Sequence, residues 1–248
     1  MALIHSFEKS GNTLFRYRGQ IPVILFILVI PVLYFTDTNW MDRNTYQILT
    51  GLAIAISILG FIVRAISIGT TPKGTSGRNT EQQVAEVLNQ TGIYSMVRHP
   101  LYLGNYLMWI GIVVFTFNIY FILIVSLAYW LYYERIMFAE ERFLERKFGN
   151  DYLDWSLKVP AFIPASKNYI KGKIPFSLIT VLRREYSGFL ATVLSYTFID
   201  HLRYYFKTGT FEPLRFSTYA LGVAIIITLI LRTLKHSTKL LNESGRSW

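Results

Sequence analysis

Two groups of ionisable side chains flank one long uncharged stretch of the sequence. Arg98 and His99 lie at its start, and Glu140 and Glu141 follow its end. Between Arg98 and Glu134, 35 residues carry no formal charge when His99 is counted as neutral. One crossing of a hydrocarbon core needs only about 20 residues, so the stretch predicts two antiparallel helices. Both ends of such a hairpin emerge on one side of a membrane, where we expect the basic and acidic groups to meet.

The residues around Pro100 have the pattern of an anion site at the start of a helix. Pro100 suits the first helical turn, and the residue before a proline favours an extended backbone. Arg98 therefore sits at a helix N-terminus, whose free amides favour anions such as a carboxylate. Tyr102 and Tyr106 lie one helical turn apart on one face, and Gly104 between them leaves room for a planar group to approach the backbone.

The elements that must position these groups are membrane helices. The chain has 248 residues, 52% of them apolar, which is typical of an integral membrane protein. We predict an all-α polytopic protein with about six transmembrane helices and a helical-hairpin cofactor site at the cytoplasmic face. The fifth helix, 186–206, is the weakest because polar residues occupy its last third. Windows free of Asp, Glu, Lys and Arg support these helices at 19–36, 44–63, 99–133, 186–199 and 216–231.

The order of these segments divides the chain into three parts. Residues 1–91 are predicted to form a two-helix membrane scaffold with a cytoplasmic loop, and residues 92–164 the core that contains the hairpin. We expect the hairpin to break near Asn118 and its second helix to run from about Ile119 to Gly149. Residues 165–248 supply a basic loop and a C-terminal helix pair. A capping box at Thr80 predicts a short amphipathic helix that runs to Gln90.

Charge placement predicts the orientation of the protein. The formal net charge is +10, but in a membrane chain the position of Lys and Arg matters more than their sum, so we expect no nucleic-acid partner. These residues concentrate at both ends and in the two large loops, which places both termini and the site in the cytoplasm. The chain has no cysteine, which excludes disulfides and cysteine metal sites, and we predict no metal site.

Several spaced blocks between residues 92 and 164 carry a family resemblance. The sequence resembles integral-membrane methyltransferases that include isoprenylcysteine carboxyl methyltransferase and phospholipid N-methyltransferases. Relatives often carry an arginine within a few residues before the glutamate pair. In this sequence the arginine lies one residue earlier than in that pattern, at Arg135. The blocks are Gly-x-Tyr-x-x-Val-Arg-His-Pro-x-Tyr-x-Gly (92–104), Glu-Glu-x-x-Leu (140–144), Phe-Gly-x-x-Tyr (148–152) and Val-Pro-x-x-Ile-Pro (159–164).

The resemblance implies S-adenosyl-L-methionine as the cofactor and a lipid-like, membrane-borne methyl acceptor. Arg135 would orient an acid or Glu134 would accept a proton from an amine, and the sequence does not decide between O- and N-methylation. Arg98 and His99 would bind the cofactor carboxylate, and a glutamate its amine or ribose hydroxyls. The full set of expected cofactor residues is Arg98, His99, Tyr102, Gly104, Tyr106, Glu140 and Glu141.

Other classes of function compete with this interpretation. The basic and acidic side chains taken singly suit membrane-interface anchors or a solvated helix face. A small transporter would show paired broken helices in two related halves, and a haem- or quinone-binding subunit would need facing histidines within its spans. A methyltransferase fold that has lost activity and serves as a scaffold is a third possibility. The sequence does not specify an oligomeric state.

Overall fold

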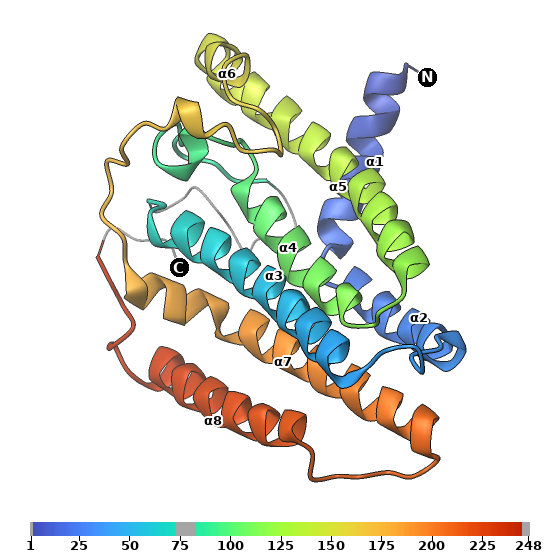
Figure 1. The fold of residues 1–248 in the computed structure, drawn as a ribbon. Coiled ribbons are helices and arrows are strands. Elements are labelled where there is room, and N and C mark those ends of the chain that lie inside the picture. The colour runs from blue at the N-terminus through green and yellow to red at the C-terminus, as the bar shows by residue number, and fades with distance from the viewer. Residues whose placement is uncertain (1, 73–82, 245–248) are drawn as a thin grey trace.

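The structure is a computed structural model that describes residues 2–72 and 83–244, with the side chains of 21–23 left out. Helices dominate these residues, which contain one isolated β-bridge, between Gly92 and Ile170, and no strand. The predicted all-α class is therefore confirmed (Figure 1). The elements are α1 Leu3–Tyr17, α2 Ile21–Phe35, α3 Arg43–Gly69, a 3-10 turn Ile93–Ser95, α4 Pro100–Val114, α5 Ile119–Phe148, α6 Asn150–Ser156, a 3-10 turn Ser166–Asn168, α7 Leu178–Thr208 and α8 Phe216–Ser237.

Small residues let α3 and α4 pack with their backbones close together. A Cβ added at Gly104 would lie 2.5 Å from Arg64 Cγ, and one at Gly111 would lie 2.6 Å from the Ala53 carbonyl oxygen. Ser57 Oγ donates to the Met108 carbonyl at 2.9 Å across the same interface. Close approach of this kind is the usual way in which membrane helices associate. It also brings the end of α3 that carries Arg64 beside the first turns of α4.

The predicted hairpin is formed by α4 and α5. The break lies where expected, because Asn118 caps α5 by accepting a hydrogen bond from the Phe121 amide at 2.9 Å. α5 then runs without interruption to Phe148 and ends at Gly149, whose φ of 54° a residue with a side chain rarely adopts. The second helix of the hairpin is thus long enough to carry its acidic residues well beyond the turn.

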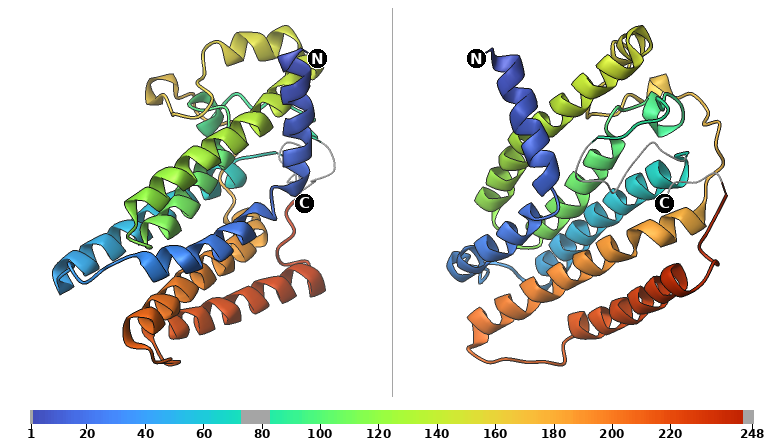
Figure 2. Two further views of the ribbon diagram at one scale, coloured as in Figure 1. Left: turned by 90° about the vertical axis from the view of Figure 1, so that its right-hand side faces the viewer. Right: turned by 180° about the vertical axis from the view of Figure 1, so that it is seen from behind.

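α7 packs along α3, and α8 packs on α7 (Figure 2). α7 begins at Leu178, capped by Ser177, and so starts eight residues before the predicted 186. The prediction was too short because Arg183 and Glu185 look like loop residues in the sequence, whereas Glu185 forms an ion pair with Arg64 of α3 at 2.6 Å.

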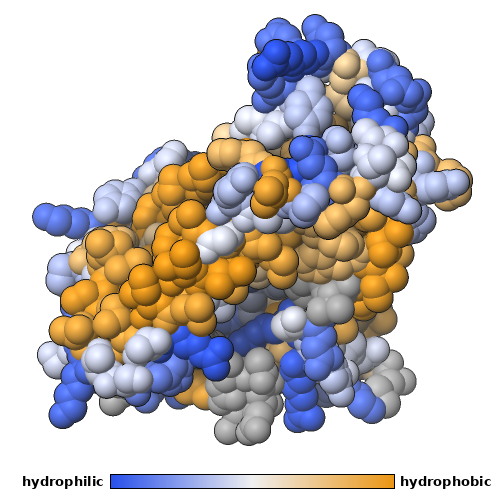
Figure 3. Space-filling view, turned by 90° about the horizontal axis from the view of Figure 1, so that it is seen from below, coloured by the Kyte–Doolittle hydropathy of each residue, from blue (hydrophilic) through white to orange (hydrophobic). Residues whose placement is uncertain are grey.

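Within the part of the chain that the structure describes, three helices, α3, α5 and α8, are long and apolar enough to cross a membrane, and α4 and part of α2 are shorter apolar helices. The expected count of six is therefore not confirmed, since α7 carries several charged residues along its length. Figure 3 shows a broad apolar surface with hydrophilic side chains gathered on either side of it. This distribution supports an integral membrane protein. The cytoplasmic placement of the termini and the site stays a prediction.

Two segments, residues 3–17 and 83–91, differ in secondary structure from the sequence prediction. The polar lead before the first apolar run forms the amphipathic helix α1, which packs on α5, with Tyr132 Oη donating to the Leu14 carbonyl at 2.7 Å. Amphipathic patterning in such a short lead was not recognised in the sequence. Thr80 of the predicted helix 80–90 lies outside the described residues, and residues 83–91 form no helix.

Candidate active site

The basic and acidic groups on the two sides of the hairpin do meet. His99 Nε2 lies 2.8 Å from Glu141 Oε1, and Arg98 Nε lies 3.1 Å from the same oxygen. Glu140 Oε2 accepts a hydrogen bond from Tyr102 Oη at 2.8 Å and lies 3.8 Å from His99 Nδ1. The Tyr102 ring stacks on the imidazole, with 5.6 Å between ring centroids. Both imidazole nitrogens therefore face carboxylates, and the hairpin closes as its charge-free length predicts.

The chain that returns after α6 fixes the start of α4. The Arg98 amide donates to the Pro160 carbonyl at 2.9 Å, and the His99 amide donates to the Ala161 carbonyl at 3.1 Å. Arg98 Nη1 donates to the Ser156 carbonyl at 2.8 Å. Pro160 and Ala161 therefore occupy these two amides, and binding of an anion by the remaining free amides of the helix terminus stays a prediction.

A cavity of about 630 Å³ opens beside this network. Four of the seven expected cofactor residues line it, namely Arg98, His99, Tyr102 and Glu140. Residues 83–85 and 87–89 contribute to another part of the wall, and α1 and the residues after it contribute Phe15, Arg18 and Gly19. Further lining residues include Arg64, Tyr94, Asn105, Met108, Trp109, Tyr133, Trp155, Arg184, Glu185, Ser187, Gly188, Ala191 and Thr192.

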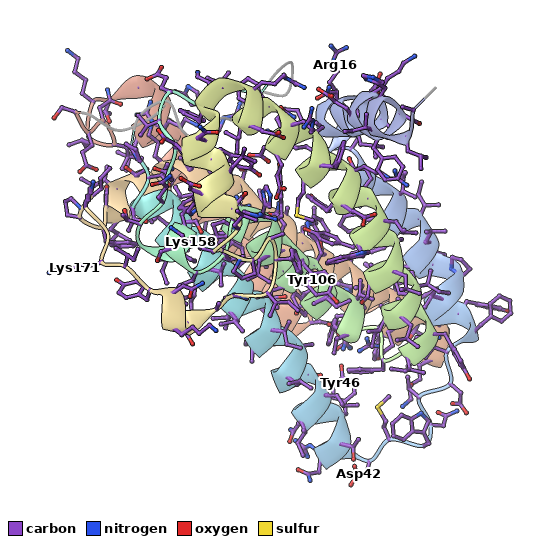
Figure 4. The ribbon with its side chains drawn as sticks, turned by 90° about the horizontal axis from the view of Figure 1, so that it is seen from above. Arg16, Asp42, Tyr46, Tyr106, Lys158 and Lys171 are labelled. Atoms are coloured by element: carbon purple, nitrogen blue, oxygen red, sulfur yellow. The ribbon has the colours of Figure 1, made fainter. Side chains whose placement is uncertain are left out.

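The other three expected cofactor residues do not line the cavity. Glu141 is engaged by Arg98 and His99. Gly104 faces α3, so its lack of a side chain serves helix packing rather than the approach of a planar ligand. Tyr106 lies between α4 and α5 (Figure 4), where its hydroxyl donates to Ser126 Oγ at 3.0 Å.

The two expected catalytic residues also lie away from the cavity lining. The Arg135 guanidinium stacks over the Phe7 ring of α1, 3.2 Å from its centroid. Glu134 precedes it on the same helix and is absent from the residues that line the cavity. These contacts support a role for Arg135 in holding α1 against α5, and the catalytic role of either residue stays a prediction.

Sequence reasoning missed the polar residues that α3, α4 and α7 contribute. Arg64 Nε and Nη2 donate to the two carboxylate oxygens of Glu185 at 2.6 and 2.7 Å, and Arg64 Nη1 donates to Asn105 Oδ1. The charge of Arg64 near the end of an apolar helix was a usable signal, because ionisable residues at that depth are usually functional. Its partner, 121 residues away, was not predictable from spacing.

Tyr94 forms another wall of the cavity. Trp155 Nε1 donates to its carbonyl oxygen at 3.2 Å, which joins the segment before α4 to α6. Burial raises the pKa of the Tyr94 hydroxyl to about 12.

The hairpin of α4 and α5 belongs to a stretch of the chain that matches a known protein family. Residues 47–151 match the phospholipid methyltransferase family. This match confirms the resemblance and extends it upstream to α3, whose Arg64 lines the cavity. α7 and α8 lie outside the matched residues.

Curated relatives point the same way. The chain is 29% identical over 122 residues to protein-S-isoprenylcysteine O-methyltransferase of Tribolium castaneum, covering 49% of this chain and 43% of the relative. It is 34% identical over 136 residues to the Xenopus laevis protein of the same name, covering 54% and 46%. The nickel-cobalt-cadmium resistance protein NccN of Alcaligenes xylosoxydans xylosoxydans is 28% identical over 149 residues, covering 60% and 65%.

These matches span only part of each relative, between 43% and 65% of its length. No solved structure matches the chain. Within the described residues, no group of three or more His, Cys, Asp or Glu side chains could hold a metal ion.

Proposed function

We propose that the protein transfers a methyl group from S-adenosyl-L-methionine to a lipid-like acceptor within the membrane. The observation that carries this proposal is the lining of one cavity by a guanidinium and imidazole from one side of the hairpin and a carboxylate from the other. The match of residues 47–151 to the phospholipid methyltransferase family and the similarity to isoprenylcysteine O-methyltransferases support the same reaction class.

The residues that line the cavity fit the charges of this cofactor. Its amino-acid end carries a carboxylate and an ammonium group, which suit Arg98 and Glu140 respectively. Glu140 has a side chain that is 32% exposed, so it has oxygen surface to offer a ligand. The rings of Tyr94, Tyr102 and Trp155 supply aromatic surface of the kind that an adenine ring needs. Glu141 would act indirectly, by holding Arg98 and His99 in place.

The bound cofactor would supply an activated methyl group on a sulfonium. The protein then mainly has to hold the acceptor in line and exclude water, and such positioning can lower a barrier by about 7 to 11 kcal/mol. His99 is buried between two carboxylates, which orient its ring at the wall of the cavity. An acid acceptor needs a cation to orient it, whereas an amine must lose a proton to a nearby carboxylate or imidazole.

The acceptor would be a membrane-borne molecule such as an isoprenylcysteine carboxylate or a phospholipid head group. The cofactor would enter from the side of the bundle that carries α6, which positive-inside bias assigns to the cytoplasm. The apolar surface of α3, α5 and α8 would keep the protein in the bilayer that contains its acceptor.

The test is methyl transfer by the purified full chain in lipid nanodiscs. Labelled S-adenosyl-L-methionine would be supplied with a farnesylcysteine derivative, with phosphatidylethanolamine, or with a total lipid extract. We expect cofactor binding and transfer of label to at least one acceptor. Binding without transfer to any acceptor would favour an inactive scaffold, and failure to bind the cofactor would favour a non-enzymatic membrane protein.

A further inference from the structure

The cavity continues beyond the proposed cofactor residues to α7. Ser187, Gly188, Ala191 and Thr192 of this helix line it, opposite Met108 of α4. α7 lies outside residues 47–151, so this wall is built by a part of the chain that the family match does not cover. These four α7 residues are small and uncharged.

Arg64 and Glu185 add a polar group to this part of the cavity. A guanidinium has five N–H donors. Glu185 accepts two of these and Asn105 accepts a third, so the contacts leave two donors of Arg64 for another acceptor. The Arg64 side chain keeps 19% of its surface exposed and lines the cavity. Because Glu185 binds it through two parallel hydrogen bonds, the guanidinium is held in one orientation.

Gly188 keeps the space beside this pair open. A Cβ at this position would lie 3.7 Å from Met108 Cε and 3.9 Å from Glu185 Oε2. These are ordinary contact distances, so the backbone does not require glycine here for packing. Longer side chains would extend into the cavity between α4 and α7.

We propose that this end of the cavity binds the methyl acceptor. An anionic oxygen of the lipid head group accepts hydrogen bonds from Arg64, and the adjoining hydrocarbon chain lies against Met108 and Gly188. Glu185 is a positioning residue that orients Arg64, and α7 sets acceptor specificity. This inference rests on the proposed methyltransferase function for its enzymatic readout, but lipid binding itself is a separate observable.

Photo-crosslinking tests the site without requiring activity. The full chain in nanodiscs would be irradiated with a diazirine-bearing farnesylcysteine, which carries a carboxylate, or a diazirine-bearing phosphatidic acid, which carries a phosphate. We expect at least one probe to label residues 187–192, with Gly188→Leu reducing the label roughly tenfold, as expected for a filled pocket. Gly222→Leu is the matched control, because a Cβ at Gly222 meets nothing within 4 Å. Equal labelling in wild type and Gly188→Leu would overturn the proposal.

Kinetics separate this inference from the proposed function. In Gly188→Leu we expect the acceptor KM to rise roughly tenfold or more, with cofactor Kd within about twofold of wild type. An unchanged acceptor KM in an active enzyme would refute the acceptor site alone. A wild-type protein that crosslinks at 187–192 but transfers no methyl group would refute the proposed function alone.

The positioning role of Glu185 needs a variant that keeps the ion pair. Glu185→Gln leaves Arg64 without its counter-charge and can impair folding. The exchange Arg64→Glu with Glu185→Arg keeps opposite charges at the two positions but moves the guanidinium to α7. We expect the exchanged protein to retain cofactor binding and to lose acceptor affinity, seen as a raised acceptor KM. An acceptor KM equal to that of wild type would show that the pair is structural only.

Discussion

Replacing Glu140 with glutamine tests the proposed cofactor site most directly. Glu140→Gln keeps the size of the side chain and removes the negative charge that would meet the cofactor ammonium. Hydrogen bonds to charged groups contribute about 1.5 to 3 kcal/mol. Because the side chain is 32% exposed, solvent screening favours the lower end of this range. A loss near 1.4 kcal/mol corresponds to about a tenfold rise in the Kd for S-adenosyl-L-methionine.

Isothermal titration calorimetry on the purified full chain measures this Kd, and thermal unfolding reports the fold. We expect the melting temperature to change little, since the Glu140 carboxylate accepts one hydrogen bond, from Tyr102, that glutamine can also accept, and lies as far as 3.8 Å from His99. Glu145→Gln is the matched control on the same helix, because Glu145 pairs with Arg142 and does not line the cavity. A Kd for Glu140→Gln within twofold of both wild type and control would refute the assignment of Glu140 to the cofactor.

Three further predictions follow from other contacts. Gly111→Val should lower the free energy of unfolding by roughly 1 to 3 kcal/mol, because the added side chain overpacks against α3. The control Gly51→Val should leave the free energy of unfolding nearly unchanged, because a Cβ at Gly51 meets nothing within 4 Å. Equal losses of stability in the two variants, measured by chemical denaturation, would contradict the packing argument. A hydrogen bond from Arg146 lowers the pKa of Glu8 below its ordinary value of 4.5, so this carboxylate stabilises the fold above pH 4.5 and loses its contribution as the pH falls through the lowered pKa. The difference in melting temperature between wild type and Glu8→Gln should therefore become smaller in acid. A difference that does not depend on pH would contradict this prediction. Arg135→Gln should increase proteolysis of α1 without changing cofactor affinity, whereas slower methyl transfer with α1 still protected would support the catalytic role predicted from sequence.

The sequence predicted those features of the site that depend on local signals. The break at Asn118, the stop at Gly149 and the charge-free length between them determine the hairpin, and the hairpin determines which end its polar residues share. The pairing of Arg64 with Glu185 was not predictable in this way, because it depends on how α3 packs against α7. Helix–helix pairing across so many residues is a result of tertiary packing, which periodicity in one segment does not report.

Individual site roles were less predictable than the position of the site. Gly104 suited both ligand approach and helix packing, since both need a missing side chain, and the structure shows the second. Arg135 lies one residue before the position that relatives often use. On a helix, one residue corresponds to a rotation of about 100°, and its guanidinium faces Phe7 rather than the cavity.

The hydrogen bonds that Pro160 and Ala161 accept from Arg98 and His99 have a consequence for biosynthesis. The entry to α4 cannot take its final shape until the ribosome has added roughly 60 more residues, which at 5 to 20 residues per second takes about 3 to 12 seconds. Those residues include α4 and α5 themselves, so both helices of the hairpin are synthesised before the segment that fixes the entry to α4. A nascent chain arrested before residue 160 would therefore contain the hairpin without a finished binding site.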